Sequence, residues 1–286
     1  MSLERQDSFG RLLSVEVFLS GTGGGAFLFG FIYAFLEAYK NAAKAGIVVG
    51  VSLVIIGTGI LFLELRNKKR FYRVFLNPSS WITRGSWLLA VFIVLGLMYL
   101  TSLYMDYLRA DSMVAKTIGV ISAFSAISVL SYPGLLFAAS KRIPLWNISG
   151  LPMLFFVSSL CTGNCIILLV SVCLGESPAG AQRPLVLIQL ILIFLHLIAL
   201  VTFLGAAAYG GTTVSQSVDS LKKNPTFVYL VIIIGLLMPL GLLGYVAVAN
   251  NAFVLSVPAG IFLLIGGLWL RYGILSAGIR LPVSVF

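Results

Sequence analysis

The stretch VEVFLSGTGGGAFLFG, residues 15–30, decides the fold class, because it combines a carboxylate and five glycines within one long apolar run. The run extends over 15–37, which matches the ~20 residues that a helix needs to cross a bilayer. Lipid disfavours the charge of Glu16, and helices disfavour glycine. Together these features predict a membrane-spanning helix whose polar and small residues face other helices and not lipid.

The rest of the chain repeats the apolar pattern. Of the 286 residues, 59% are hydrophobic and only 10% are charged, whereas soluble domains carry about 25% charged residues. Because backbone polar groups must be paired inside lipid and no alternating strand pattern is present, the spans are predicted to be helices. The expected class is an all-α integral membrane protein with eight transmembrane helices, the other seven lying near 46–65, 84–104, 117–139, 151–174, 184–209, 226–248 and 252–272.

The distribution of charge predicts the orientation. Eight crossings place both ends of the chain on one side, and fourteen of the nineteen Lys and Arg residues, Arg271 among them, fall on that side. Positive residues favour the cytoplasm, which predicts cytoplasmic termini; the alternative is that this basic face is a docking surface for an acidic partner. The net charge of +10 does not indicate nucleic acid as a partner, because the cations lie in short connections and form no stripe. The basic and aromatic connection 65–83 is expected to lie along the membrane interface.

The histidine and cysteine content limits the cofactors. A membrane haem b usually needs two axial histidines, so a single histidine, His196, excludes that ligation. The three cysteines, Cys161, Cys165 and Cys173, lie in one apolar run, which favours packing over disulfides or cluster ligands. No metal site is predicted. The start, MSLERQDSF, lacks the pattern of a cleaved signal peptide.

Several buried polar groups are candidates for proton transfer. His196 shares a helix face with Gln189 and Phe203 at seven-residue spacing, which leaves open a structural hydrogen bond or a role in a proton relay. Carboxylates at the ends of spans commonly reach the headgroups. The proton-path candidates are therefore His196 and three end-of-span acids, Glu37, Glu64 and Asp106.

Glu16 differs from these acids, because Ser20, Gly23 and Gly24 lie on its helix face. The pattern Gly21-x-x-x-Gly25 is typical of close helix packing. The alternative is that glycines beside a carboxylate leave room for a flat ring.

Tyr132 is expected at a similar depth to Glu16, since it precedes the basic connection at 141–142 by about two turns. A phenol and a carboxylate at one depth can both hydrogen-bond the polar ring of a hydrophobic molecule. The alternative is an ordinary interfacial aromatic residue. A further pattern, SGTGGGAF at 20–27 and SLCTGNCI at 159–166, indicates two related four-helix bundles, 1–140 and 141–286.

Four motifs in order resemble the polysulfide reductase/NrfD membrane subunits. The head of the first span reads EVFLSGTGGGA, and LNPSSWITRGSW at 76–87 follows a basic connection and opens the third span. YPGLL, KRIPLWN and LPMLFF follow one another between 132 and 156, and RYGILSAG at 271–278 ends the last span. These motifs touch spans one to five and eight, which is most of the chain.

The resemblance implies a haem-free anchor that exchanges electrons between a quinone, menaquinone or ubiquinone, and an iron–sulfur partner subunit. That partner commonly serves a molybdopterin catalytic subunit, so substrate chemistry would occur in a different chain. The implied location is the prokaryotic cytoplasmic (inner) membrane. Many relatives place the quinone side outside the cell, whereas the charges of this chain favour the cytoplasm.

Residue by residue, the resemblance puts Glu16 at the polar quinone contact of the first span and Tyr132 at the tyrosine contact of the fourth. Ser20, Gly23 and Gly24 would line the same site, and Leu13 replaces a polar residue found in some relatives. Trp81 and Arg84 would shape its entrance near the docking surface.

Two other functions remain as alternatives. An ion- or proton-translocating protein or transporter would suit two four-helix halves, yet Pro133 and Pro239 do not occupy equivalent spans as inverted-repeat transporters require. A passive anchor that binds no quinone is the second alternative.

Overall fold

A computed structural model describes residues 11–64, 68–104, 112–140, 142–175, 183–249 and 253–279. Over these residues the fold is all-helical, and eight helices are long and apolar enough to cross a membrane, as predicted. Seven spans are α1 (Arg11–Tyr33), α2 (Lys40–Glu64), α3 (Trp81–Tyr104), α4 (Met113–Ala138), α5 (Gly150–Cys173), α6 (Arg183–Ala208) and α10 (Ser256–Ser276). The remaining span joins α8 (Pro225–Phe227), the π-helix η3 (Val228–Leu237) and α9 (Met238–Val248).

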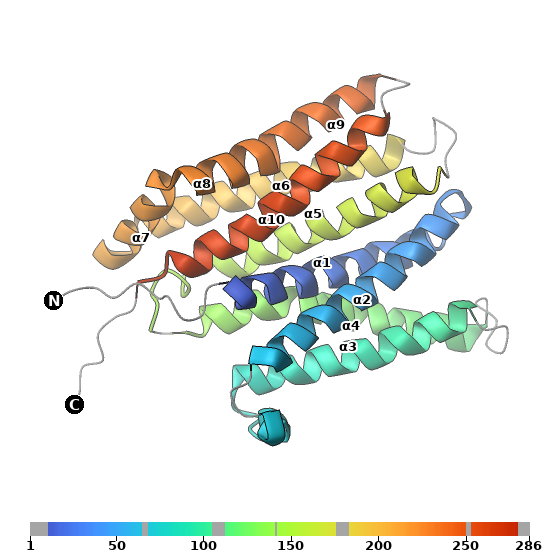
Figure 1. Cartoon of the computed structure of the whole chain (residues 1–286), viewed down its shortest axis with the longest axis horizontal. Helices are drawn as coiled ribbons and strands as arrows, with labels where there is room; N and C mark the ends of the chain where they lie inside the picture. Colours follow the sequence, from blue (N-terminus) through green and yellow to red (C-terminus); the bar gives the residue numbers. More distant parts are fainter. Residues whose placement is uncertain are drawn as a thin grey trace.

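The spans lie alongside one another and alternate in direction, so that α1 begins and α10 ends at the same end of the molecule (Figure 1). We call this the terminal end, and the end where α1 finishes the opposite end. The short helices η2 (Lys68–Phe75) and α7 (Thr212–Lys223) lie at the terminal end, whereas η1 (Glu37–Tyr39) and η4 (Phe253–Leu255) lie at the opposite end (Figure 1). The axis of η2 lies across the direction of the spans, which suits a segment at the membrane interface (Figure 1).

Helix α1 lies inside the molecule, because it contacts α2, α4, α5 and α10. In the most apolar stretch of α1, 67% is buried inside the molecule, against 28% in that of α3. The outer helices direct large apolar side chains such as Val94 and Phe194 outward, as lipid contact requires.

Glycines allow this central position, since each removes a Cβ where another backbone passes. A Cβ on Gly23 would stand 2.5 Å from the Gly50 carbonyl oxygen of α2, and one on Gly25 would stand 2.5 Å from the Ser159 carbonyl oxygen of α5. Gly24 faces α4. The predicted close packing is therefore confirmed, with different glycines serving different neighbours.

The division into bundles at 1–140 and 141–286 stays a prediction. Helices α1 to α4 contact one another, and α5 contacts α6 and α10, but α1 also packs along α5 and α10. The two echoing motifs meet at this crossing, where Thr22 Oγ1 donates a hydrogen bond of 2.9 Å to Thr162 Oγ1. Helix α1 is already helical at Arg11, four residues before the predicted start, which places Glu16 within the helix and not at its head.

Candidate functional site

Glu16 is buried inside the spanning region, with only 3% of its surface exposed. Ser20 lies one turn further along α1 and donates a hydrogen bond of 2.8 Å from Oγ to Glu16 Oε1. The Ser20 hydroxyl also faces Gly57 of α2, where an added Cβ would lie 3.0 Å from it. The predicted orientation of Glu16 toward other helices is confirmed. Intramembrane carboxylates are rare and usually functional.

Tyr132 approaches the same region from α4 and is also buried, at 6% exposure. Its ring lies directly against Gly85 of α3, where a Cβ would overlap the ring and the hydroxyl. The phenol and the Glu16 carboxyl group are close enough to interact electrostatically. The first four spans thus each contribute to one group of residues, the Glu16 cluster: Glu16, Ser20, Gly57, Gly85 and Tyr132.

The other predicted contact residues lie around this cluster. Trp81 and Arg84 occupy the exposed surface of the first turn of α3, with the guanidinium 5.1 Å from the indole centroid. Arg84 Nε donates to the Pro78 carbonyl oxygen at 3.0 Å. Gly23 and Gly24 contact α2 and α4. Their predicted role beside a bound ring remains a prediction.

The structure describes the side chains of two of the proton-path candidates, Glu37 and His196. Glu37 lies at the opposite end, 87% exposed at its side chain, and pairs with Lys40 at 3.3 Å. The side chain of Glu64 and the whole of Asp106 lie outside the described residues. His196 is buried at 2% exposure on the predicted face with Gln189 and Phe203.

Arg271 was predicted among the cations of the terminal face, but it is fully buried within α10. Its Nη atoms donate to Ser158 Oγ at 3.1 Å, to Ser159 Oγ at 2.8 Å and to the Gly267 carbonyl oxygen at 2.8 Å. The physical reason is that α10 continues to Ser276, beyond the predicted end at 272, so Arg271 stays inside the bundle. One feature of the sequence could have indicated this position: Arg271 follows the last apolar run directly, with no turn between them.

Arg271 contacts one face of α1, and the side chain of Glu16 extends from another face of the same helix. The guanidinium lies over the Phe18 ring, 5.4 Å from its centroid, and beside Gly21. Glu16 instead shares its face with Ser20 and Gly57. The chain therefore holds two separate buried polar regions.

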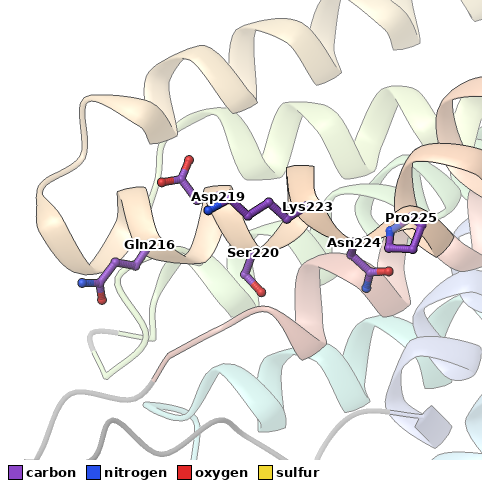
Figure 2. A pocket seen from close by; sticks show the side chains of 6 residues that line it. All are labelled: Gln216, Asp219, Ser220, Lys223, Asn224 and Pro225. Atoms are coloured by element: carbon purple, nitrogen blue, oxygen red, sulfur yellow. The ribbon is translucent and has the colours of Figure 1, made fainter.

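The described ranges contain no group of three or more His, Cys, Asp or Glu side chains that could hold a metal ion. Cys161 and Cys165 are buried, Cys173 is exposed, and all three are free thiols. An open hollow of about 550 Å³ lies elsewhere, at the terminal end, and Figure 2 shows its lining along α7 and its junction with α8. The lining side chains are Gln216, Asp219, Ser220, Lys223, Asn224 and Pro225.

Comparison with known families identifies the chain. A family model described as "Polysulphide reductase, NrfD" matches residues 2–282. The chain belongs to the NrfD family. No curated protein matches the sequence. The match includes every described span, so the Glu16 cluster and Arg271 both lie within the NrfD region, and the resemblance seen in four motifs is confirmed.

Proposed function

We propose that this NrfD protein is the haem-free membrane anchor of a respiratory oxidoreductase. It exchanges electrons between a quinone, menaquinone or ubiquinone, and an iron–sulfur partner subunit. The observation that carries the proposal is the buried Glu16 carboxyl group, held by Ser20 and within electrostatic reach of the Tyr132 phenol. The single histidine of the chain is consistent with an anchor that lacks bis-histidine haem.

The chemistry of the Glu16 cluster fits a quinone. A quinone supplies a two-electron, two-proton couple, so a site for it needs a group that exchanges protons with a ring oxygen. The Glu16 carboxyl oxygen would hold or release that proton, and Ser20 keeps the carboxyl group oriented by its hydrogen bond. Tyr132 would donate from Oη to orient the quinone ring, and Gly85 lets the Tyr132 ring pack directly against the backbone of α3.

The proposed partner would dock at the terminal end. Glu16 lies in the part of α1 nearer this end, and the exposed pair of Trp81 and Arg84 lies in the first turn of α3. The start of α3 and the short helix η2 lie at this end (Figure 1). A molybdopterin subunit would bind through the iron–sulfur subunit and carry the substrate chemistry. The charge distribution favours a cytoplasmic terminal end, and the proposed location is the inner membrane of a prokaryotic cell.

The proposal is tested by purifying the tagged full-length chain from native membranes in mild detergent. Mass spectrometry is expected to identify an iron–sulfur protein at a stoichiometric level, and solvent extraction is expected to release a quinone. Recovery of the folded chain with neither an iron–sulfur partner nor a quinone would overturn the proposal.

Gly85→Ala tests the role of Tyr132 in quinone binding. The new Cβ overlaps the Tyr132 ring, so the phenol must move away from its position against α3. We expect the quinone KM of the assembled complex to rise severalfold, with the amount of complex unchanged. Gly59→Ala in α2 is the matched control, because no atom lies within 4 Å of its added Cβ. Equal quinone KM values for the two variants would contradict this role.

A further inference from the structure

A chain of buried hydrogen bonds lies in the polar region on the Arg271 side of α1. Tyr33 Oη donates to Asn164 Oδ1 at 2.7 Å, and Asn164 Nδ2 donates to Gln189 Oε1 at 2.9 Å. Gln189 Nε2 donates in turn to Cys161, at 3.1 Å from its carbonyl oxygen and 3.2 Å from Sγ. The chain joins α1, α5 and α6 without using any residue of the Glu16 cluster.

The chain of hydrogen bonds begins at the opposite end of the molecule. Tyr33 is the last residue of α1, and its ring centroid lies 5.7 Å from that of Tyr39. Tyr39 follows the exposed Glu37 by two residues within η1. Tyr33 and Tyr39 therefore connect Asn164 to the exposed surface at η1.

The chain of hydrogen bonds leads toward His196 and Arg271. His196 lies seven residues after Gln189 on the same buried face of α6, about 10 Å nearer the terminal end. Arg271 binds Ser158 and Ser159 of α5 at a similar depth and interacts electrostatically with His196. From Tyr33 to Gly21, which faces Arg271, the distance along α1 is about 18 Å, over half of a ~30 Å hydrocarbon core.

Three nitrogen atoms at the inner end need hydrogen-bond partners. In the part of the chain that the structure describes, no group hydrogen-bonds His196 Nδ1, His196 Nε2 or Arg271 Nε, and all three are buried. Buried polar groups in folded proteins are almost always paired, and internal water is the usual partner where protein groups are not. A network that served only to hold helices together would not leave both nitrogens of a histidine unpaired.

We propose that this region is a proton-access path, which runs from the opposite end through Tyr33, Asn164, Gln189 and Cys161 to His196. Water within the path carries the proton, and the two amide side chains orient the water, since neither amide is a proton carrier. His196 receives the proton on one imidazole nitrogen, with no change of redox state. Arg271 closes the inner end, because its positive charge makes the protonation of His196 transient and opposes further movement of a proton toward the terminal end.

The path extends beyond the proposed quinone chemistry, because it lies on the other side of α1 from Glu16. Of the predicted acids, Glu37 is the one whose side chain the structure describes, and it lies exposed near the start of the path. The path contains His196, the other predicted candidate among the described side chains.

Hydrogen–deuterium exchange tests the path in the full-length protein reconstituted in lipid. Infrared spectroscopy follows the S–H bands, which Cys161→Ala and Cys165→Ala assign, and NMR of labelled histidine follows His196 alone because the chain has one histidine. Cys165 lies one turn nearer the opposite end than Cys161 and bonds instead to the Gly260 carbonyl oxygen, 3.4 Å away. The path predicts that the deeper thiol, Cys161, exchanges faster than Cys165. General loosening of α5 predicts the reverse order.

Asn164→Leu breaks the path without removing either reporter. We expect it to slow exchange at both Cys161 and His196 to the rate of Cys165. Ser171→Ala is the matched control on α5, since Ser171 is also fully buried but bonds only to the Leu168 carbonyl oxygen. We expect the rates in this control, and in Glu16→Gln, to equal those of the wild type.

Slow exchange at Cys161 in the wild type, exchange at Cys165 as fast as at Cys161, or unchanged rates in Asn164→Leu would each overturn the path. A thermal unfolding curve for each variant establishes that the rates come from folded protein. Because Glu16→Gln is measured for both proposals, loss of quinone turnover with normal exchange separates the two functions.

Discussion

Glu16→Gln is expected to abolish quinone-linked turnover while the complex still assembles. Glutamine preserves the size of the side chain and can accept the hydrogen bond from Ser20, so the packing of α1 is retained. It cannot take up or release a proton at the ring oxygen. Loss of a positioned proton-transfer group lowers turnover by about a hundredfold or more. The measurement is quinol oxidation or quinone reduction by the purified complex, with subunit content determined in parallel.

Glu37→Gln is the matched control, because Glu37 is exposed and pairs only at the surface with Lys40. Its turnover is expected to equal that of the wild type. Normal turnover in Glu16→Gln would contradict the assignment of Glu16 to the proton step. Loss of the complex in that variant would instead indicate a structural role for the carboxyl group.

Gly163→Ala is expected to produce the largest loss of stability among the glycine substitutions. The added Cβ would overlap the backbone of Gly25, which a change of rotamer cannot relieve, so α1 and α5 must separate. Overpacking of this kind costs about 3 kcal/mol. Separation of the two helices would also disturb the hydrogen bond between Thr22 and Thr162.

Thermal unfolding in detergent measures this effect, with Gly241→Ala as the matched control. Gly241 lies within α9, and nothing stands within 4 Å of its added Cβ. The control is expected to unfold at or above the temperature of the wild type, because alanine favours the helix. Equal unfolding temperatures for the two variants would show that α1 and α5 do not depend on backbone contact at Gly163.

Sequence patterns were sufficient to predict the spans and the general position of Glu16. Hydropathy depends on each residue and its neighbours along the chain, so eight apolar runs predict eight helices whatever their packing. A carboxylate with serine and glycine at helical spacing also had to face another helix, because lipid offers it no partner. Ser20 meets Glu16 as that spacing requires.

The neighbours of each residue could not be predicted in this way. Gly23 meets α2, Gly24 meets α4 and Gly25 meets α5, although the three are consecutive in the sequence. Likewise, nothing in the local sequence of Gly85 indicates that it receives the ring of Tyr132. These contacts depend on how each helix is rotated and on which helix lies beside it.

The sequence by itself therefore determined the class of the protein, the number of spans, the family and the polar head of α1. Tertiary structure alone decided that Arg271 is buried beside α5, and that Tyr33, Asn164 and Gln189 form one chain of hydrogen bonds. The physical reason is that lipid and the interior of a helix bundle are equally apolar. Hydropathy identifies a residue as lying within the membrane, but only the packing of helices decides whether it meets lipid or another helix.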